Sequence, residues 1–93
     1  MELDKELGIK QIKKVFKMKF KMKLKILKEL DKGNINISDL SRKTGISYKE
    51  THRQVNDLAS WGFLVRVRRL YEKHRPVELR LTKGGLAFYH LIK

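Results

Sequence analysis

The chain has 93 residues, of which 23 are Lys or Arg and 10 are Asp or Glu, so its formal net charge is +13. This length suits one small domain with a core of its own, and the absence of Cys excludes disulfides and thiolate metal or redox sites. We therefore expect a single cytoplasmic domain in a reduced compartment, with no signal peptide and no membrane partner. The excess of positive charge indicates a polyanionic partner, but charge alone does not separate DNA, RNA and an anionic lipid surface.

The stretch at residues 17–25, K-M-K-F-K-M-K-L-K, alternates charged and apolar residues as a half-buried strand does. We nevertheless predict a helix over residues 9–32, bent near Lys17, because no Gly or Pro interrupts it and Lys, Met and Leu are good helix formers. In this interpretation residues 1–16 are an N-terminal extension and residues 17–32 are the first helix of the domain.

On a helical wheel, Lys19 and Lys23 fall within the apolar arc of this helix and divide it into two flanks. We expect the long Lys stems to snorkel between the flanks, while the other lysines mainly raise the surrounding positive potential. One flank would then pack on this domain and the other on a terminal helix or a dimer partner. The residues expected to face the core are Met22, Ile26, Leu27 and Leu30.

A short second helix is predicted over residues 38–45. The preceding residues 34–37, N-I-N-I, are too few for a helix and favour a brief extended piece. Ser38 offers an N-cap oxygen and Gly45 supplies a left-handed stop.

A third helix is predicted over residues 47–61. Ser47 and Glu50 have the S-x-x-E spacing of a capping box, and Gly62 marks the end of the helix. The second and third helices are joined by a short turn that contains a glycine. This arrangement is typical of a helix-turn-helix.

The segment at residues 63–81 alternates with period 2 on two arms, with Y-E-K-H-R-P between them, which predicts a β-hairpin. In this alternation Val65 and Val67 take the apolar side of the first arm. Thr82 can then cap a last helix over residues 83–92, despite the two early glycines of that helix.

In this order and spacing, the segments resemble the winged-helix transcription regulators of archaea and bacteria, of the general MarR or ArsR kind. The resemblance covers residues 23 to about 90 and is carried by K-L-K-I-L-K-E-L, I-S-D-L-S-R-K-T-G-I-S, V-N-D-L-A-S-W-G-F-L-V and V-E-L-R-L-T-K-G-G. It implies an α+β, mainly helical fold: a winged helix-turn-helix with a two-stranded β-hairpin wing and flanking N- and C-terminal helices. It also implies sequence-specific binding of double-stranded DNA.

The helix at residues 47–61 has the two sides that such a DNA-reading helix needs. Thr51, Val55 and Leu58 form an apolar side, and a polar arc lies opposite. Arg53 can pair with guanine O6 and N7, and Asn56 with adenine N6 and N7. The DNA contacts expected from this helix are Ser47, Tyr48, Lys49, His52, Arg53 and Asn56.

The hairpin supplies a second basic site, because basic residues share the polar parity of its arms and crowd its tip. A wing of this kind follows the phosphate backbone or enters the minor groove. The expected wing contacts are Arg66, Arg68, Lys73, His74, Arg75 and Arg80, with Arg75 the foremost candidate. In the alternative interpretation the charges protect a sheet edge, and Arg66 and Arg68 face Glu78 across the sheet.

Apolar residues near both ends of the chain predict a homodimer interface, with intramolecular packing of the terminal helices as the alternative. They are Leu3, Leu7, Ile12, Leu86, Tyr89 and Ile92, with His90 among them. The three histidines lack a ligand spacing, and no nucleophile, carboxylate cluster or phosphate loop is recognisable, so we expect no metal, no cofactor and no enzymatic activity. Two other functions remain open: a winged-helix module that binds RNA or protein in a larger assembly, and a non-specific architectural DNA-binding protein.

Overall fold

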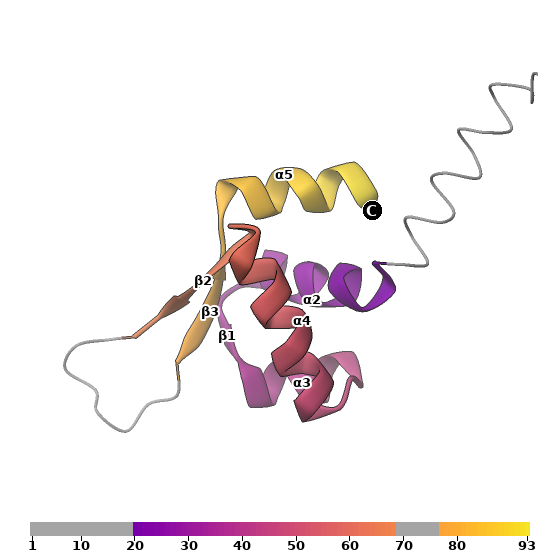
Figure 1. Cartoon of the computed structure of the whole chain (residues 1–93), viewed down its shortest axis with the longest axis vertical. Coiled ribbons are helices and arrows are strands. Elements are labelled where there is room, and N and C mark those ends of the chain that lie inside the picture. Colours follow the sequence, from indigo (N-terminus) through magenta and orange to yellow (C-terminus); the bar gives the residue numbers. More distant parts are fainter. Residues whose placement is uncertain (1–19, 69–76) are drawn as a thin grey trace, which may run out of the picture.

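The computed structural model describes residues 20–68 and 77–93. Within these ranges the chain forms four helices and one antiparallel sheet of three strands, in the order α2 (Lys21–Lys32), β1 (Ile35–Asn36), α3 (Ile37–Thr44), α4 (Tyr48–Ser60), β2 (Leu64–Val67), β3 (Glu78–Leu81) and α5 (Lys83–Ile92). Figure 1 shows β2 and β3 extending away from the helices as a wing, while α5 lies beside α2. The mainly helical winged helix-turn-helix predicted from the sequence is confirmed.

Some predictions lie outside the described residues. They are the N-terminal extension, the helix N-terminal to α2, the terminal residues Leu3, Leu7 and Ile12, and the wing-tip residues Lys73, His74 and Arg75. The helix Lys21–Lys32 includes residues 21–25 of the alternating stretch, so these residues form a helix and not a strand. No helix in the described ranges has the length and apolar character needed to cross a bilayer.

The start of α3 differs from the prediction because Asn36, not Ser38, caps it. The Asn36 Oδ1 accepts a hydrogen bond from the Asp39 backbone N–H at 2.8 Å, and the Asn36 amide donates to the Asp39 carboxylate at 2.9 Å. This pair satisfies a backbone donor that the first turn would otherwise leave open. The helix ends as predicted at Gly45, whose φ of 73° is left-handed.

The sheet has one strand more than the predicted hairpin. The extended piece before α3 pairs with β3, with Ile35 opposite Leu79 and Asn36 opposite Glu78, and gives the strand order β1-β3-β2. A two-residue pairing of this kind occupies the free edge of β3. It also ties the wing to the start of the helix-turn-helix.

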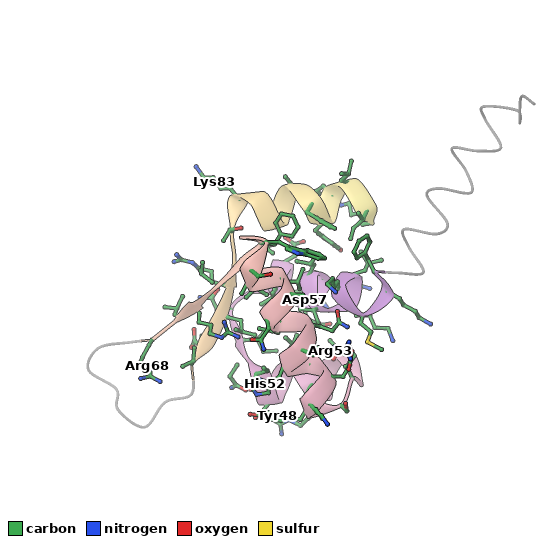
Figure 2. All side chains as sticks on the ribbon, viewed as in Figure 1. Tyr48, His52, Arg53, Asp57, Arg68 and Lys83 are labelled. Atoms are coloured by element: carbon green, nitrogen blue, oxygen red, sulfur yellow. The ribbon has the colours of Figure 1, made fainter. Side chains whose placement is uncertain are left out.

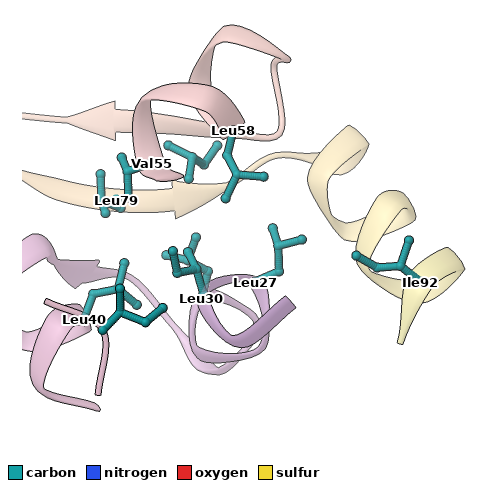
Figure 3. Packing of buried hydrophobic residues seen from close by; sticks show 10 residues of the cluster. Leu27, Leu30, Leu40, Val55, Leu58, Leu79 and Ile92 are labelled. Atoms are coloured by element: carbon teal, nitrogen blue, oxygen red, sulfur yellow. The ribbon is translucent and has the colours of Figure 1, made fainter. Parts of the chain in front are cut away.

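The core lies between α2, α4 and the sheet, and α3 and α5 close its two ends (Figure 3). The apolar side predicted for α4 is confirmed, because Thr51, Val55 and Leu58 are 0% exposed. Met22 was expected in the core but is 43% exposed. The buried hydrophobic residues are Ile26, Leu27, Leu30, Leu40, Ile46, Val55, Leu58, Leu64, Leu79 and Ile92.

The first arm of the wing has the opposite phase to the one predicted. Leu64 is 1% exposed whereas Val65 is 38% exposed, because Leu64 pairs with Leu81 on the core side and Val65 pairs with Arg80. Residues directly opposite one another in an antiparallel pair share a face. Arg66 therefore lies on the core side of the sheet and Arg80 on the other.

The pairing also corrects the alternative role suggested for the arginines of this arm. Glu78 lies opposite Val67, and Arg66 lies opposite Leu79. Neither Arg66 nor Arg68 is therefore the direct cross-strand partner of Glu78.

The two glycines at the start of α5 have different surroundings. The Thr82 hydroxyl accepts from the Gly85 N–H at 3.0 Å and donates to the Gly62 carbonyl at 2.7 Å, which draws the helix against the start of β2. A Cβ at Gly85 would lie 1.9 Å from the Phe63 carbonyl oxygen, whereas the nearest atoms to one at Gly84 are 3.8 Å away. Only Gly85 is required by this close approach.

We therefore expect opposite effects from two adjacent substitutions. Gly84→Ala should raise the free energy of unfolding by up to about 1 kcal/mol, the ordinary gain of Ala over Gly in a helix. Gly85→Ala should lower it by about 2 kcal/mol or more, because backbone atoms must move to relieve the overlap. Urea denaturation of both variants measures the difference, and equal effects would contradict the assigned close approach.

Candidate nucleic-acid interface

The turn before α4 is fixed by short hydrogen bonds. The Ser47 hydroxyl accepts from the Glu50 backbone N–H at 3.2 Å, which is the predicted N-cap contact. The buried Thr51 hydroxyl donates to the Ser47 carbonyl at 2.8 Å, and the Ser41 hydroxyl donates to the Ile46 carbonyl at 2.6 Å. These bonds hold α4 at a set angle to α3, as a helix that enters a groove requires.

The polar arc predicted on α4 is present. Lys49, His52, Arg53 and Asn56 are spaced as neighbours on one helix face, and all but the half-buried His52 are exposed. Figure 2 shows Tyr48, His52 and Arg53 along the first part of the helix. The Tyr48 ring, 53% exposed, meets the His52 ring edge to face at 4.6 Å between centroids, so the two rings form one end of the arc.

Arg53 keeps most of its guanidinium available for a ligand. Its side chain is 77% exposed, and its nearest acidic partner is Glu50, at 3.9 Å between Nη1 and Oε2. An exposed pair at this separation contributes little to stability. The guanidinium can therefore leave Glu50 for a base or a phosphate at small cost.

The wing joins the arc through Arg66. Its Nη2 donates a hydrogen bond to the Asn56 Oδ1, which links β2 to the exposed face of α4. Arg68 lies exposed at the outer end of the same arm (Figure 2), whereas Arg80 is exposed on the opposite face of the sheet. Of the predicted wing residues that the structure describes, Arg66 is therefore the one that continues the arc of α4.

A residue outside the predicted site sets the position of α4. Lys23 is 7% exposed, and its Nζ donates to the Gln54 Oε1 at 2.6 Å and to the Asp57 carboxylate at 3.2 Å. The ammonium also lies 5.1 Å from the Trp61 ring centroid, a cation–π distance. Lys23 thus does not snorkel to the surface but binds α2 to α4 through Gln54 and Asp57.

The comparisons with known proteins agree with a winged helix-turn-helix fold. Residues 20–65 match the family described as winged helix-turn-helix DNA-binding, and no curated protein matches the chain. Escherichia coli MarR solved with operator DNA is 23% identical, with a TM-score of 0.66 over 74% of this chain and 49% of that one. BldR from Sulfolobus solfataricus is 17% identical, with a TM-score of 0.70 over 99% of this chain and 76% of that one.

The fold is that of a winged helix-turn-helix, and the matched residues are similar to the winged helix-turn-helix DNA-binding family. Its structural neighbours are MarR-family transcriptional regulators, including the archaeal BldR. The chain spans about half the length of the E. coli MarR chain to which it is similar, 51% in the apo form.

The contacts of Lys23 generate a stability prediction. Lys23→Ala should lower the free energy of unfolding by about 2 kcal/mol, since it removes a buried stem and leaves Gln54 and Asp57 without their donor. The loss stays below that of a fully buried ion pair because the Asp57 side chain is 50% exposed and can be hydrated. Lys23→Met should recover about half of the loss by restoring the apolar stem.

Chemical denaturation of these variants, with the exposed Lys28→Ala as the matched control, measures these effects. The control should change stability by no more than about 0.5 kcal/mol. Equal stability of the Lys23→Ala and Lys28→Ala proteins would show that the buried contacts of Lys23 contribute nothing.

Proposed function

We propose that the protein is a transcriptional regulator that binds double-stranded DNA in a sequence-specific manner. In this proposal α4 enters the major groove, and the wing lies on the backbone or in the adjacent minor groove. The observation that carries it is the polar arc of Lys49, His52, Arg53 and Asn56 on a helix capped by Ser47, extended onto the wing by Arg66. As a regulator that binds DNA, it would act in the cytoplasm.

Each residue of the arc has a role that suits its chemistry. Arg53 is placed to pair with a guanine edge, and Lys49 to take a base edge or a phosphate. In this proposal Ser47, Tyr48 and His52, at the start of the helix, contact the DNA backbone. On the wing, Arg68 and Arg80 and the tip residues Lys73, His74 and Arg75 are proposed contacts to phosphates or to the minor groove.

We further propose that the regulator is a homodimer, so that two copies of α4 reach successive major grooves about 34 Å apart. The support is the exposure of two apolar side chains of α5, since Leu91 is 84% exposed and Leu86 is 37% exposed. Ile92, one of the residues first considered for this interface, is 8% exposed and belongs to the core of its own domain. We propose its exposed neighbour Leu91 as the interface residue instead.

The main test compares alanine variants of α4 on selected DNA. A specific site is first obtained by selecting bound genomic fragments. Arg53→Ala should then lose about 1–3 kcal/mol of discrimination at one base pair. Lys83→Ala removes the same charge from the start of α5, at the other end of the molecule from Tyr48 in Figure 2, and should leave discrimination unchanged.

A salt titration of the same complex separates this proposal from the architectural alternative. Affinity should fall steeply with salt, with a slope of about −0.9 for each phosphate neutralised. Steep salt dependence with no preferred sequence would indicate a non-specific architectural protein. Tighter binding of RNA than of the selected duplex would indicate the RNA-binding module, provided that the Arg53→Ala substitution changes the affinity for neither nucleic acid.

The homodimer is tested by Leu91→Asp. Because Leu91 is almost fully exposed in the domain, the substitution should leave the melting temperature of the domain nearly unchanged. It should weaken self-association by about tenfold or more, the effect of losing one apolar anchor from an interface. Sedimentation equilibrium measures this effect, and an unchanged oligomeric state would place the interface elsewhere.

A further inference from the structure

We propose that Arg66 determines which base Asn56 selects, by turning the Asn56 amide into a group that offers only donors to the DNA. The inference rests on the proposed function and goes beyond it. It makes a residue of the wing strand a specificity-determining residue of the recognition helix. It also replaces the adenine preference expected of Asn56 from its sequence position by a preference for guanine.

The orientation of the Asn56 amide follows from the chemistry of its partner. A guanidinium carries five N–H donors and no acceptor, so the atom of Asn56 that faces Arg66 must be the carbonyl Oδ1. The Nδ2 amino group is then directed away from Arg66. The contact therefore removes the ambiguity between the two ends of the amide.

Both partners are held from behind by buried neighbours. Asn56 follows Val55, which is 0% exposed, and Arg66 lies two residues beyond Leu64, which is 1% exposed. The register places Arg66 opposite Leu79 on the core side of the sheet, the side that faces the helices. The strand phase thus brings the exposed Arg66 side chain to the exposed Asn56 side chain.

The resulting pair is complementary to guanine. To read adenine, an Asn amide accepts from the N6 amino group and donates to N7. With Arg66 on Oδ1, the N6 amino group would approach a positively charged donor. The guanine edge presents two acceptors, O6 and N7, which match a free guanidinium N–H and the Asn56 Nδ2–H.

The experiment measures base preference with the full-length protein and its selected duplex. The base pair read by Asn56 is the one at which Asn56→Ala flattens the preference. The wild-type protein should prefer guanine at this position, and Arg66→Ala should shift the preference toward adenine by about fivefold or more, the smallest effect of one bidentate pair. Arg66→Lys should behave like Arg66→Ala, because a single ammonium cannot reach both the Asn56 Oδ1 and a guanine acceptor.

Arg80→Ala is the matched control, since it removes the same charge from the opposite face of the same sheet. It should weaken binding without any change in preference at the Asn56 position. A uniform loss of affinity across all four bases in Arg66→Ala, with the salt slope reduced by about one, would assign Arg66 to a phosphate and overturn the inference. So would a wild-type preference for adenine at this position.

The failure of the proposed function has a different signature. A wild-type protein that binds all duplexes equally would overturn both conclusions together. Specific binding that survives in Arg66→Ala with an unchanged guanine preference overturns only the role of Arg66.

Discussion

The buried ammonium of Lys23 is the contact on which the placement of α4 depends. It joins α2 to α4 through Gln54 and Asp57, and it lies against Trp61 at the end of α4. The desolvation of one charge is offset by a neutral acceptor, a carboxylate and an aromatic face at once. Because these partners are spread over two turns of α4, the ammonium resists both sliding and rotation of that helix on α2.

The same contact explains how a helix tolerates the pattern K-M-K-F-K-M-K-L-K. In the described part of this stretch, Lys21 and Lys25 face the solvent while Lys23 points inward, and the apolar Met22 is the residue left partly exposed. The favourable local propensities of Lys, Met and Leu allowed the helix to be predicted. The place of Lys23 within the apolar arc was predicted, but its polar partners were not, because they lie more than thirty residues away.

The elements that were predicted well are those whose signals are local. The Ser47 cap, the left-handed Gly45 and the apolar side of α4 each depend on residues within one or two turns. Where two local signals compete, the sequence alone does not decide between them. Asn36 and Ser38 are both good N-cap residues, but Asn36 caps α3 because it is the last residue of β1 and has an extended backbone. The phase of β2 has the same difficulty, since Phe63, Leu64 and Val65 are all apolar and only the packed core selects Leu64.

The phase of β2 also determines which residues form the candidate site. With Leu64 turned inward, Arg66 lies on the helix side of the sheet and contacts Asn56. The α4 residues identified from the sequence therefore have Arg66 as a partner. The alternation in the sequence predicts Arg66 on the other face of the sheet. The candidate site is then formed by one helix and one strand, both anchored in a single core. On the proposed role of Arg66, α4 is not an independent reading unit, because the base that Asn56 selects is set by a residue that arrives from the wing. A change of packing that shifts β2 by one residue would alter the specificity while leaving every residue of α4 unchanged.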